Sequence, residues 1–131
     1  MSDPLSTTEA FGILEQIKAT GNPIVILSGG EPMMREDLFE IARYGTRLGL
    51  KMAMGTSGYL FDENTVQHLK DSGILSVAFS IDSADPADHD TFRGCPGAWE
   101  KAVNAIQSCV SAGIGVQINM TILEPNPLEL D

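Results

Sequence analysis

The sequence of 131 residues contains no apolar run long enough to cross a membrane, and its polar start, MSDPLSTTEA, is unlike a secretory signal peptide. We therefore expect a cytoplasmic location and no membrane partner. Basic residues are also scarce, with eight Lys and Arg against eighteen Asp and Glu and a formal net charge of −10. Such a charge repels a phosphate backbone, so nucleic acid is not an expected partner. It is typical instead of solvated helix faces.

Cysteine is scarce as well. The two cysteines, Cys95 and Cys109, are separated by residues 96–108, and neither belongs to a CxxC pair or another short metal-ligand spacing. Cys109 falls on the apolar side of an expected helix and is interpreted as a small core residue. Cys95 falls in an expected loop. We therefore expect two free thiols and no metal site among these residues.

Apolar residues at helical spacing alternate along the chain with short runs of β-forming residues. A capping box at Ser6–Glu9 opens the first helix, and Gly21 closes it. The expected helices cover residues 6–20, 35–48, 62–73 and 97–112, and the expected strands cover 23–28, 50–55, 75–81 and 115–122. Strands joined through helices favour right-handed crossovers and a parallel sheet. The sequence therefore predicts one α/β domain with about four parallel strands.

A long loop is predicted after the third strand, where the sequence reads DSADPADHDTFRGCP. His89 lies there between two aspartates and is interpreted as a surface residue. Arg93 has two interpretations, an exposed salt bridge, which is favoured, or contact with a substrate. A proline-broken tail is predicted after residue 122.

Polar or glycine-rich residues follow every expected strand. In parallel α/β folds the carboxyl ends of the strands meet at one edge, where ligands bind. The candidate site at this edge comprises Ser28-Gly29-Gly30-Glu31, Gly55-Thr56-Ser57-Gly58, Ser80 with Asp82, and Asn119 with Thr121.

The chemistry of this edge favours a zwitterionic, nucleoside-like ligand. Glycines let a ligand approach the backbone closely. The backbone carbonyls and the Glu31 carboxylate are acceptors, so they suit an ammonium group or hydroxyls rather than a phosphate. The phosphate-binding pattern GxxxxGK[ST] does not occur in the sequence. Ser80, Asp82 and Asn119 suit ribose hydroxyls or a carboxylate.

Each part of the candidate site also has a purely structural interpretation. Gly29-Gly30 before Pro32 would turn the chain into the next helix. The stretch from Gly55 to Gly58 would be an ordinary turn, and Ser80 and Asp82 would cap backbone amides. The case for a site rests on the four strand ends together.

The motifs, in their order along the chain, resemble the radical S-adenosylmethionine (SAM) enzymes. The similarity extends from about Leu5 to Ile122 and is carried by SGGEP, REDLFEIARYGTRLGL, GTSGYL, VAFSIDSADPADHDTFRG and GVQINMTI. The stretch HDTFRGCPGAWEKAVNAIQSC resembles the heme-biosynthesis members, which share a branch with the SPASM-type peptide-modifying members. The resemblance implies a partial TIM-type barrel in which this chain supplies strands two to five.

The resemblance also implies roles for individual residues. Gly29, Gly30 and Glu31 match the family motif that receives the α-ammonium group of SAM. Ser80 and Asp82 match positions facing the ribose or the SAM carboxylate, and Asn119 matches a further polar contact. Thr56 and Ser57 occupy a place where relatives often have Thr-Asn-Gly, so the serine is a departure. The matching gives no residue of this chain a catalytic role.

One departure from the family is larger. The CxxxCxxC motif that holds the [4Fe–4S] cluster is absent from the sequence. We therefore expect residues 1–131 to be a fragment of a single radical SAM core domain, with the cluster bound only in a longer parent. The parent is expected to be an oxidoreductase that cleaves SAM to a 5′-deoxyadenosyl radical and takes a hydrogen atom from a small molecule or a peptide, as in heme biosynthesis or peptide modification.

The fragment itself is expected to be inactive and to bind SAM weakly, and its cut sheet edges invite self-association. Two alternatives are a cluster-free module that binds a nucleoside or an amino acid, and a half-barrel whose role is self-association.

Overall fold

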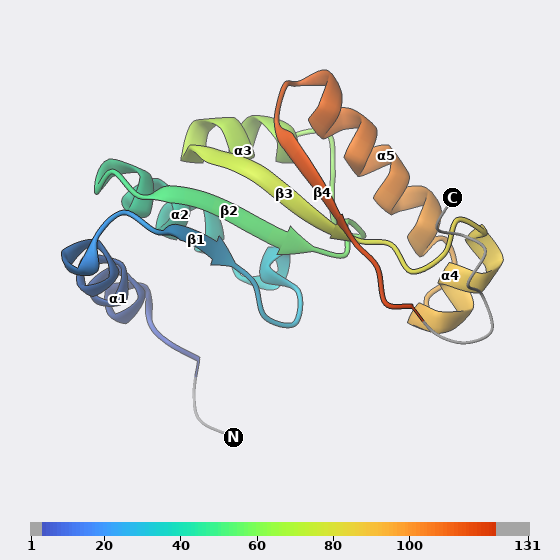
Figure 1. Cartoon of the computed structure of the whole chain (residues 1–131), viewed down its shortest axis with the longest axis horizontal. Coiled ribbons are helices and arrows are strands. Elements are labelled where there is room, and N and C mark those ends of the chain that lie inside the picture. The colour runs from blue at the N-terminus through green and yellow to red at the C-terminus, as the bar shows by residue number, and fades with distance from the viewer. Residues whose placement is uncertain (1–3, 123–131) are drawn as a thin grey trace.

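The computed structural model describes residues 4–122 and contains a four-stranded parallel sheet in the order β1-β2-β3-β4 (Figure 1). The strands are β1 (Ile24–Leu27), β2 (Lys51–Thr56), β3 (Ile74–Ser80) and β4 (Gly115–Asn119). The helices are α1 (Thr7–Thr20), the 3₁₀ helix η1 (Pro32–Met34), α2 (Leu38–Arg47), α3 (Thr65–Ser72), α4 (Pro86–Arg93) and α5 (Ala98–Ser111). The predicted α/β class, the number of strands and their parallel pairing are confirmed.

The core lies between one face of the sheet and helices α2, α3 and α5. Alternation along β2 turns Met52 and Met54 toward these helices, and both are buried. At Gly45 in α2, a Cβ would meet the sulfur of Met52, so the present packing of the flexible Met52 side chain against α2 uses the space that glycine leaves. Cys109 is fully buried as predicted, and burial raises the pKa of its thiol to about 11.

The opposite face of the sheet is open. Ile24 is 64% exposed and Ile26 is 61% exposed, although most parallel sheets are covered on both faces. The strand register places the following residues on this face: Ile24, Ile26, Lys51, Ala53, Gly55, Ser76, Ala78, Ser80, Gly115, Gln117 and Asn119. Most of these are small or polar, as suits the inner face of a barrel rather than a second hydrophobic core.

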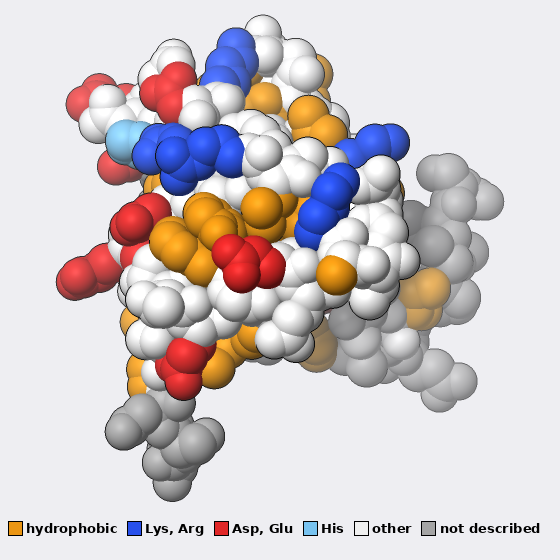
Figure 2. Space-filling view, turned by 90° about the vertical axis from the view of Figure 1, so that its left-hand side faces the viewer, with side chains coloured by type: hydrophobic (Ala, Val, Ile, Leu, Met, Phe, Trp, Pro, Cys, Tyr) orange, Lys and Arg blue, Asp and Glu red, His pale blue; other side chains and the backbone are white. Residues whose placement is uncertain are grey.

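Charges of both signs share the surface at the end of the molecule shown in Figure 2. Acidic and basic side chains lie there around exposed hydrophobic ones, so the net negative charge does not form one continuous patch on this face. None of the helices among residues 4–122 is both long enough and apolar enough to span a membrane.

The segment after β3 corrects the sequence analysis. The long loop predicted there contains helix α4, which begins because the Asp85 side chain accepts hydrogen bonds from the Ala87 and Asp88 amides. The helix ends at Gly94 in the left-handed conformation, with φ +65°. His89, predicted at the surface, is 1% exposed because it lies on the inner side of this helix.

Smaller differences concern the ends of elements. Helix α2 begins at Leu38 rather than at residue 35, because Pro32–Met34 form η1 first. Strand β4 ends at Asn119 rather than at residue 122. The predicted proline-broken tail lies outside the described residues.

Candidate functional site

The carboxyl ends of the four strands meet at one edge, and the chain bends sharply after β1 (Figure 1). Ser28, Gly29 and Gly30 are exposed there, with Gly29 at φ +149°, a conformation that residues with a Cβ rarely adopt. The bend therefore leaves backbone groups exposed at this edge of the sheet.

Glu31 follows this bend and joins the ends of β1 and β2. One carboxylate oxygen accepts hydrogen bonds from the Thr56 hydroxyl at 2.6 Å and the Met33 amide at 3.2 Å. The other accepts from the Ser57 amide at 2.9 Å and the Ser57 hydroxyl at 2.6 Å. No ion pair with another part of the described chain neutralises this carboxylate. Its position is fixed while its charge is available to a ligand ammonium group.

The turn after β2 also supports this arrangement. Thr56 is buried, and its hydroxyl both donates to Glu31 and accepts from the Gly58 amide at 3.1 Å. Gly58 has φ +79°, and a Cβ there would lie 3.0 Å from the Ala102 Cα and 3.1 Å from the Phe79 ring. The stretch from Gly55 to Gly58 is therefore a turn, and the same turn positions Glu31.

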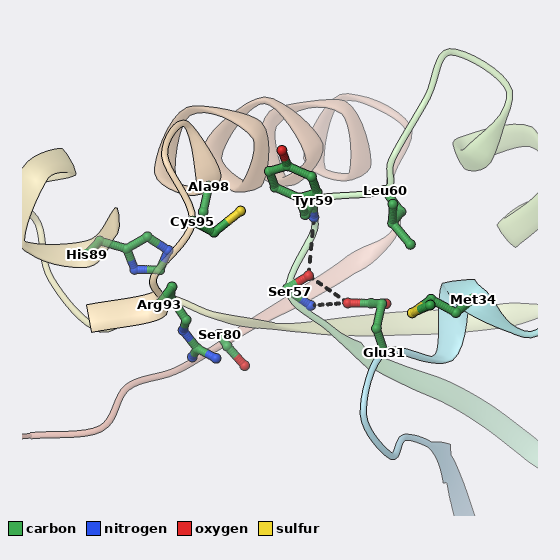
Figure 3. Close-up of a pocket in the computed structure, with 10 residues that line it drawn as sticks. All are labelled: Glu31, Met34, Ser57, Tyr59, Leu60, Ser80, His89, Arg93, Cys95 and Ala98. Carbon is green, nitrogen blue, oxygen red and sulfur yellow. Dashed lines mark hydrogen bonds between the residues drawn. The ribbon is translucent and has the colours of Figure 1, made fainter. Parts of the chain in front are cut away.

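A cavity of about 300 Å³ adjoins Glu31. Its lining comprises Glu31, Met34, Ser57, Tyr59, Leu60, Ser80, His89, Arg93, Cys95 and Ala98. Figure 3 shows Glu31 and Arg93 toward opposite ends of the cavity, with Ser57 and Ser80 between them. The cavity thus has an anionic end and a cationic end.

The resemblance gave roles to eight residues of this chain, and three of them line this cavity: Glu31, Ser57 and Ser80. Thr56 acts behind them through its bond to Glu31, and Gly29 and Gly30 form the adjacent bend. Asn119 is not brought to the cavity. It is exposed on the open face of the sheet, and its side-chain oxygen accepts a hydrogen bond from Gln117 at 2.7 Å.

Asp82 is engaged within the protein. Its side chain is 3% exposed, one carboxylate oxygen lies 2.6 Å from Arg93 Nε, and the other accepts from the Thr121 amide at 3.0 Å. The Asp82 amide donates to His89 Nδ1 at 3.1 Å. Asp82 therefore ties the end of β3 to α4 and to the segment after β4. The favoured interpretation of Arg93 as a member of a salt bridge is confirmed, but the predicted exposure of that bridge is wrong, because its partner Asp82 is a buried carboxylate.

Burial favours the neutral form of His89, which can accept the hydrogen bond from the Asp82 amide. Burial lowers the pKa of its imidazole, against the smaller opposing effect of the Asp82 charge. A neutral ring has a nitrogen free of its proton, and the acceptor Nδ1 is that nitrogen.

Five residues that line the cavity were not predicted from the sequence. Met34, Tyr59, Leu60, Cys95 and Ala98 were not proposed as site residues, although Tyr59 and Leu60 directly follow the glycine-rich turn. Met34 follows SGGEP closely, and the signal for Cys95 and Ala98 was the Asp85-Pro86 helix start, because a helix in that segment brings the chain after it back over the strand ends.

The resemblance implies two cofactors, SAM and a [4Fe–4S] cluster, and the residues present suit SAM but not the cluster. An exposed glycine bend beside a carboxylate without a cation suits the amino-acid end of SAM. A cluster held by thiolates does not fit, because the sequence has two cysteines and Cys109 is fully buried. No group of three or more His, Cys, Asp or Glu side chains suited to a metal ion occurs within residues 4–122.

Comparison with known proteins agrees with this geometry. The family model described as Radical SAM superfamily matches residues 2–129, and the chain belongs to this superfamily. Its members use SAM and a [4Fe–4S] cluster, and the cluster-binding motif does not occur in the 131 residues.

Curated relatives extend the comparison. The AdoMet-dependent heme synthase of Methanosarcina barkeri is 42% identical over 126 residues, which cover 96% of this chain and 36% of the relative. The pre-heme d1 synthase of Dinoroseobacter shibae is 36% identical over 96% of this chain and 31% of its own length. The mycofactocin maturase MftC of Mycobacterium tuberculosis is 30% identical over 97% of this chain and 32% of its own length. The chain thus spans about a third of the length of these relatives.

A solved structure supports the fold. Streptococcus suis SuiB bound to S-adenosylmethionine matches with a TM-score of 0.78 at 21% sequence identity, over 92% of this chain and 28% of the SuiB chain. The four strands with their helices are therefore part of a TIM-type barrel, as the resemblance implied, and the open face is the one that such a barrel encloses.

Proposed function

We propose that this chain forms the SAM-binding part of a radical SAM oxidoreductase that acts on a tetrapyrrole in heme biosynthesis. The observation that carries the proposal is the Glu31 carboxylate, fixed by four hydrogen bonds beside an exposed glycine bend and a cavity. The names of the relatives favour a tetrapyrrole, because the heme-related synthases are 35–42% identical and the peptide cyclase and maturases 30–31%.

In this proposal the residues divide the recognition of SAM. The backbone of Gly29 and Gly30 accepts hydrogen bonds from the α-ammonium group, and Glu31 supplies the opposite charge. Ser57 and Ser80 present hydroxyls to the carboxylate or the ribose from within the cavity. Thr56 keeps Glu31 in place, and Asn119, outside the cavity on the open face of the sheet, adds a polar contact only where SAM extends over that face. The cluster would have to be held by residues outside these 131, and with it SAM would supply a radical for hydrogen-atom abstraction.

We propose a supporting role for Asp82, since both of its carboxylate oxygens are engaged inside the protein. We further propose that the 131 residues form part of one core domain and do not turn over alone, because they lack the thiolates for a cluster. The exposed isoleucines of β1 favour self-association of the isolated chain.

Titration calorimetry of SAM into the 131-residue chain tests the binding role. Saturable binding is expected, and Glu31→Gln is expected to weaken it about 10-fold or more, because a charge-assisted interaction is lost. Glu40→Gln on the exposed side of α2 is the matched control and is expected to bind like the wild type. Equal SAM affinity in the Glu31→Gln and Glu40→Gln variants would contradict the assignment.

Absorbance titration with iron coproporphyrin III tests the tetrapyrrole assignment, since one relative is named as an Fe-coproporphyrin III synthase. A saturable shift of the Soret band is expected. Its absence, with SAM binding intact, would favour a peptide or another substrate instead.

A further inference from the structure

A second cavity, of about 680 Å³, adjoins Glu31 on the side of α1. One wall is the start of α1 with the residues before it, and the other is the segment that leads from Glu31 into α2. Glu31 lines this cavity as well as the cavity of about 300 Å³ described above. Because the two walls are separated by a cavity, side-chain packing does little at this place to hold one wall against the other.

One hydrogen bond joins the two walls. The Thr7 hydroxyl in the first turn of α1 donates to the Asp37 carboxylate, and no other hydrogen bond connects residues 4–9 with residues 31–37 in the described part of the chain. Asp37 also pairs with Arg35, whose Nε lies 2.5 Å from one carboxylate oxygen and whose Nη2 donates to the other at 2.9 Å. Asp37 thus links the first turn of α1 to the segment that begins at Glu31.

The Asp37 side chain does not serve its own helix. Asp37 directly precedes α2, and an aspartate at such a position commonly accepts a hydrogen bond from a helix amide. The Asp37 carboxylate makes no bond of this kind. The hydrogen bond from Arg35, and to a smaller extent that from Thr7, hold the pKa of this carboxyl below its usual value, so it is charged at neutral pH. The carboxylate is therefore engaged with the segment before it and with α1.

Backbone hydrogen bonds connect Asp37 with Glu31. The Met34 amide donates to the Glu31 carbonyl at 3.1 Å, which closes the first turn after Glu31. The 3₁₀ helix η1 follows, and the Leu38 amide then donates to the Arg35 carbonyl at 3.2 Å. A segment made of successive closed turns has little freedom to bend, so we expect a displacement at Asp37 to reach Glu31.

We propose that Asp37 is a positioning residue, which holds Glu31 in place for SAM by tying the segment between them to Thr7 of α1. This inference rests on the proposed function and extends the support of Glu31 beyond the four hydrogen bonds to its carboxylate. Two of those bonds are 2.6 Å long, and binding groups need to be held within about 0.5 Å of their productive position. Loss of the tie therefore weakens SAM binding, although Asp37 does not line the cavity that contains Ser57 and Ser80.

Thr7→Val tests this role, because it removes the hydroxyl that donates to Asp37 and leaves the segment from Glu31 to Asp37 unchanged. Calorimetric titration of SAM into the 131-residue chain is expected to show a loss of affinity of about 5-fold. Thr8→Val makes the same replacement at the next, exposed position of α1 and is expected to bind like the wild type. Equal SAM affinity in the Thr7→Val and Thr8→Val variants would overturn the proposal.

Asp37→Ala removes the contacts with both Thr7 and Arg35. It is expected to lower SAM affinity at least as much as Thr7→Val does. Unchanged affinity in Asp37→Ala would show that the tie has no effect on the site. Circular dichroism checks that each variant is folded.

A double-mutant cycle separates positioning of Glu31 from a general effect on the fold. In the Glu31→Gln background, Thr7→Val is expected to leave SAM affinity close to that of Glu31→Gln alone, because the carboxylate that the tie positions is absent. The melting temperature is expected to change by the same amount in both backgrounds, since stability does not depend on a ligand. A further 5-fold loss of affinity in the Glu31→Gln background would assign the effect to the fold as a whole and overturn the proposal.

The outcomes also distinguish this inference from the proposed function. If the wild type binds SAM and Glu31→Gln weakens the binding but Thr7→Val does not, the proposed function stands and the inference alone fails. If the wild type does not bind SAM, both fail, and any change of melting temperature in Thr7→Val leaves Asp37 with a structural role only.

Discussion

Glu31 and Arg93 stand toward opposite ends of one cavity, and the protein holds them in different ways. Glu31 is held by neutral donors, the hydroxyls and amides of Thr56, Ser57 and Met33, and forms no ion pair within residues 4–122. Arg93 is held by the opposite charge of buried Asp82. Hydrogen bonds from neutral groups fix the Glu31 carboxylate without neutralising it, so it can attract a cation. The ion pair with Asp82 fixes Arg93 through Nε and leaves the other N–H groups of the guanidinium to donate hydrogen bonds in defined directions.

The largest expected effect is at the Arg93 end. Asp82→Ala removes the buried carboxylate that joins β3, α4 and the segment after β4, and we expect it to lower the free energy of unfolding by about 3 kcal/mol. This figure is at the low end for a buried pair because Arg93 is partly exposed. Urea unfolding followed by circular dichroism measures it. Asp88→Ala on the exposed side of α4 is the control, and an equal loss in both variants would contradict the anchoring role of Asp82.

At the Glu31 end the largest effect is expected from Gly58→Ala, which should lower the free energy of unfolding by about 2 kcal/mol. The alanine would adopt φ +79° and press its Cβ against the Ala102 backbone and the Phe79 ring. Gly94→Ala is a matched control, because Gly94 also has positive φ, at +65°, but a Cβ there meets nothing within 4 Å. Thermal unfolding of both variants separates backbone strain from overpacking. Equal losses would show that packing under α5 is not the reason for glycine at position 58.

A smaller effect is expected from removing one neutral donor. Thr56→Val keeps the shape of the side chain but loses the hydrogen bond to Glu31 and leaves the Gly58 amide without its acceptor. We expect this change to lower the free energy of unfolding by about 1.5 kcal/mol. SAM affinity measured by calorimetry is expected to fall as well, since Glu31 loses its support. Thr91→Val on the exposed side of α4 controls for the β-branched replacement. Wild-type SAM affinity in Thr56→Val would indicate that the remaining donors suffice.

The smallest expected effect is a dependence on pH that belongs to the Arg93 end alone. Burial lowers the pKa of His89 below its unfolded value, so the unfolded state binds a proton more readily than the folded state. The stabilisation by neutral His89 is complete above the unfolded pKa of about 6.5 and is lost as the pH falls below it.

Melting temperatures at pH 7.5 and pH 5.5 test this dependence. His89→Asn keeps an acceptor near the position of Nδ1 and cannot titrate, so we expect it to reduce the difference in melting temperature between the two pH values. His68→Asn at an exposed position of α3 is the matched control. The same reduction in both variants would mean that His89 is not the source.

The local sequence pattern was sufficient to predict much of the fold and part of the candidate site. The alternation of helical spacing with β-forming runs predicted the parallel sheet, and the polar residues after the strands predicted the edge that holds Glu31, Thr56 and Ser57. These predictions succeed because parallel strands place their carboxyl ends together whatever the details of packing.

The segment after β3 shows where such reasoning failed. The segment DSADPADHDTFRGCP was predicted to be a loop, so helix α4 and the burial of His89 were missed. A short polar helix has a weak periodic signal, and its burial depends on the strand ends over which it folds. Asp82 was grouped with Ser80 by the alternation of side chains, but its partner Arg93 becomes visible only once α4 is in place.

By itself the sequence determined the fold class, the family and the edge of the sheet where the candidate site lies, because the alternation of helices and strands, the glycine bends and the residues of SGGEP are local properties of the chain. Only the tertiary structure decided that, within residues 4–122, Glu31 has no counter-ion while Asp82 has one, and that Arg93 lines the same cavity. Those facts depend on which side chains meet across segments distant in sequence, and burial then determines which charges need a partner.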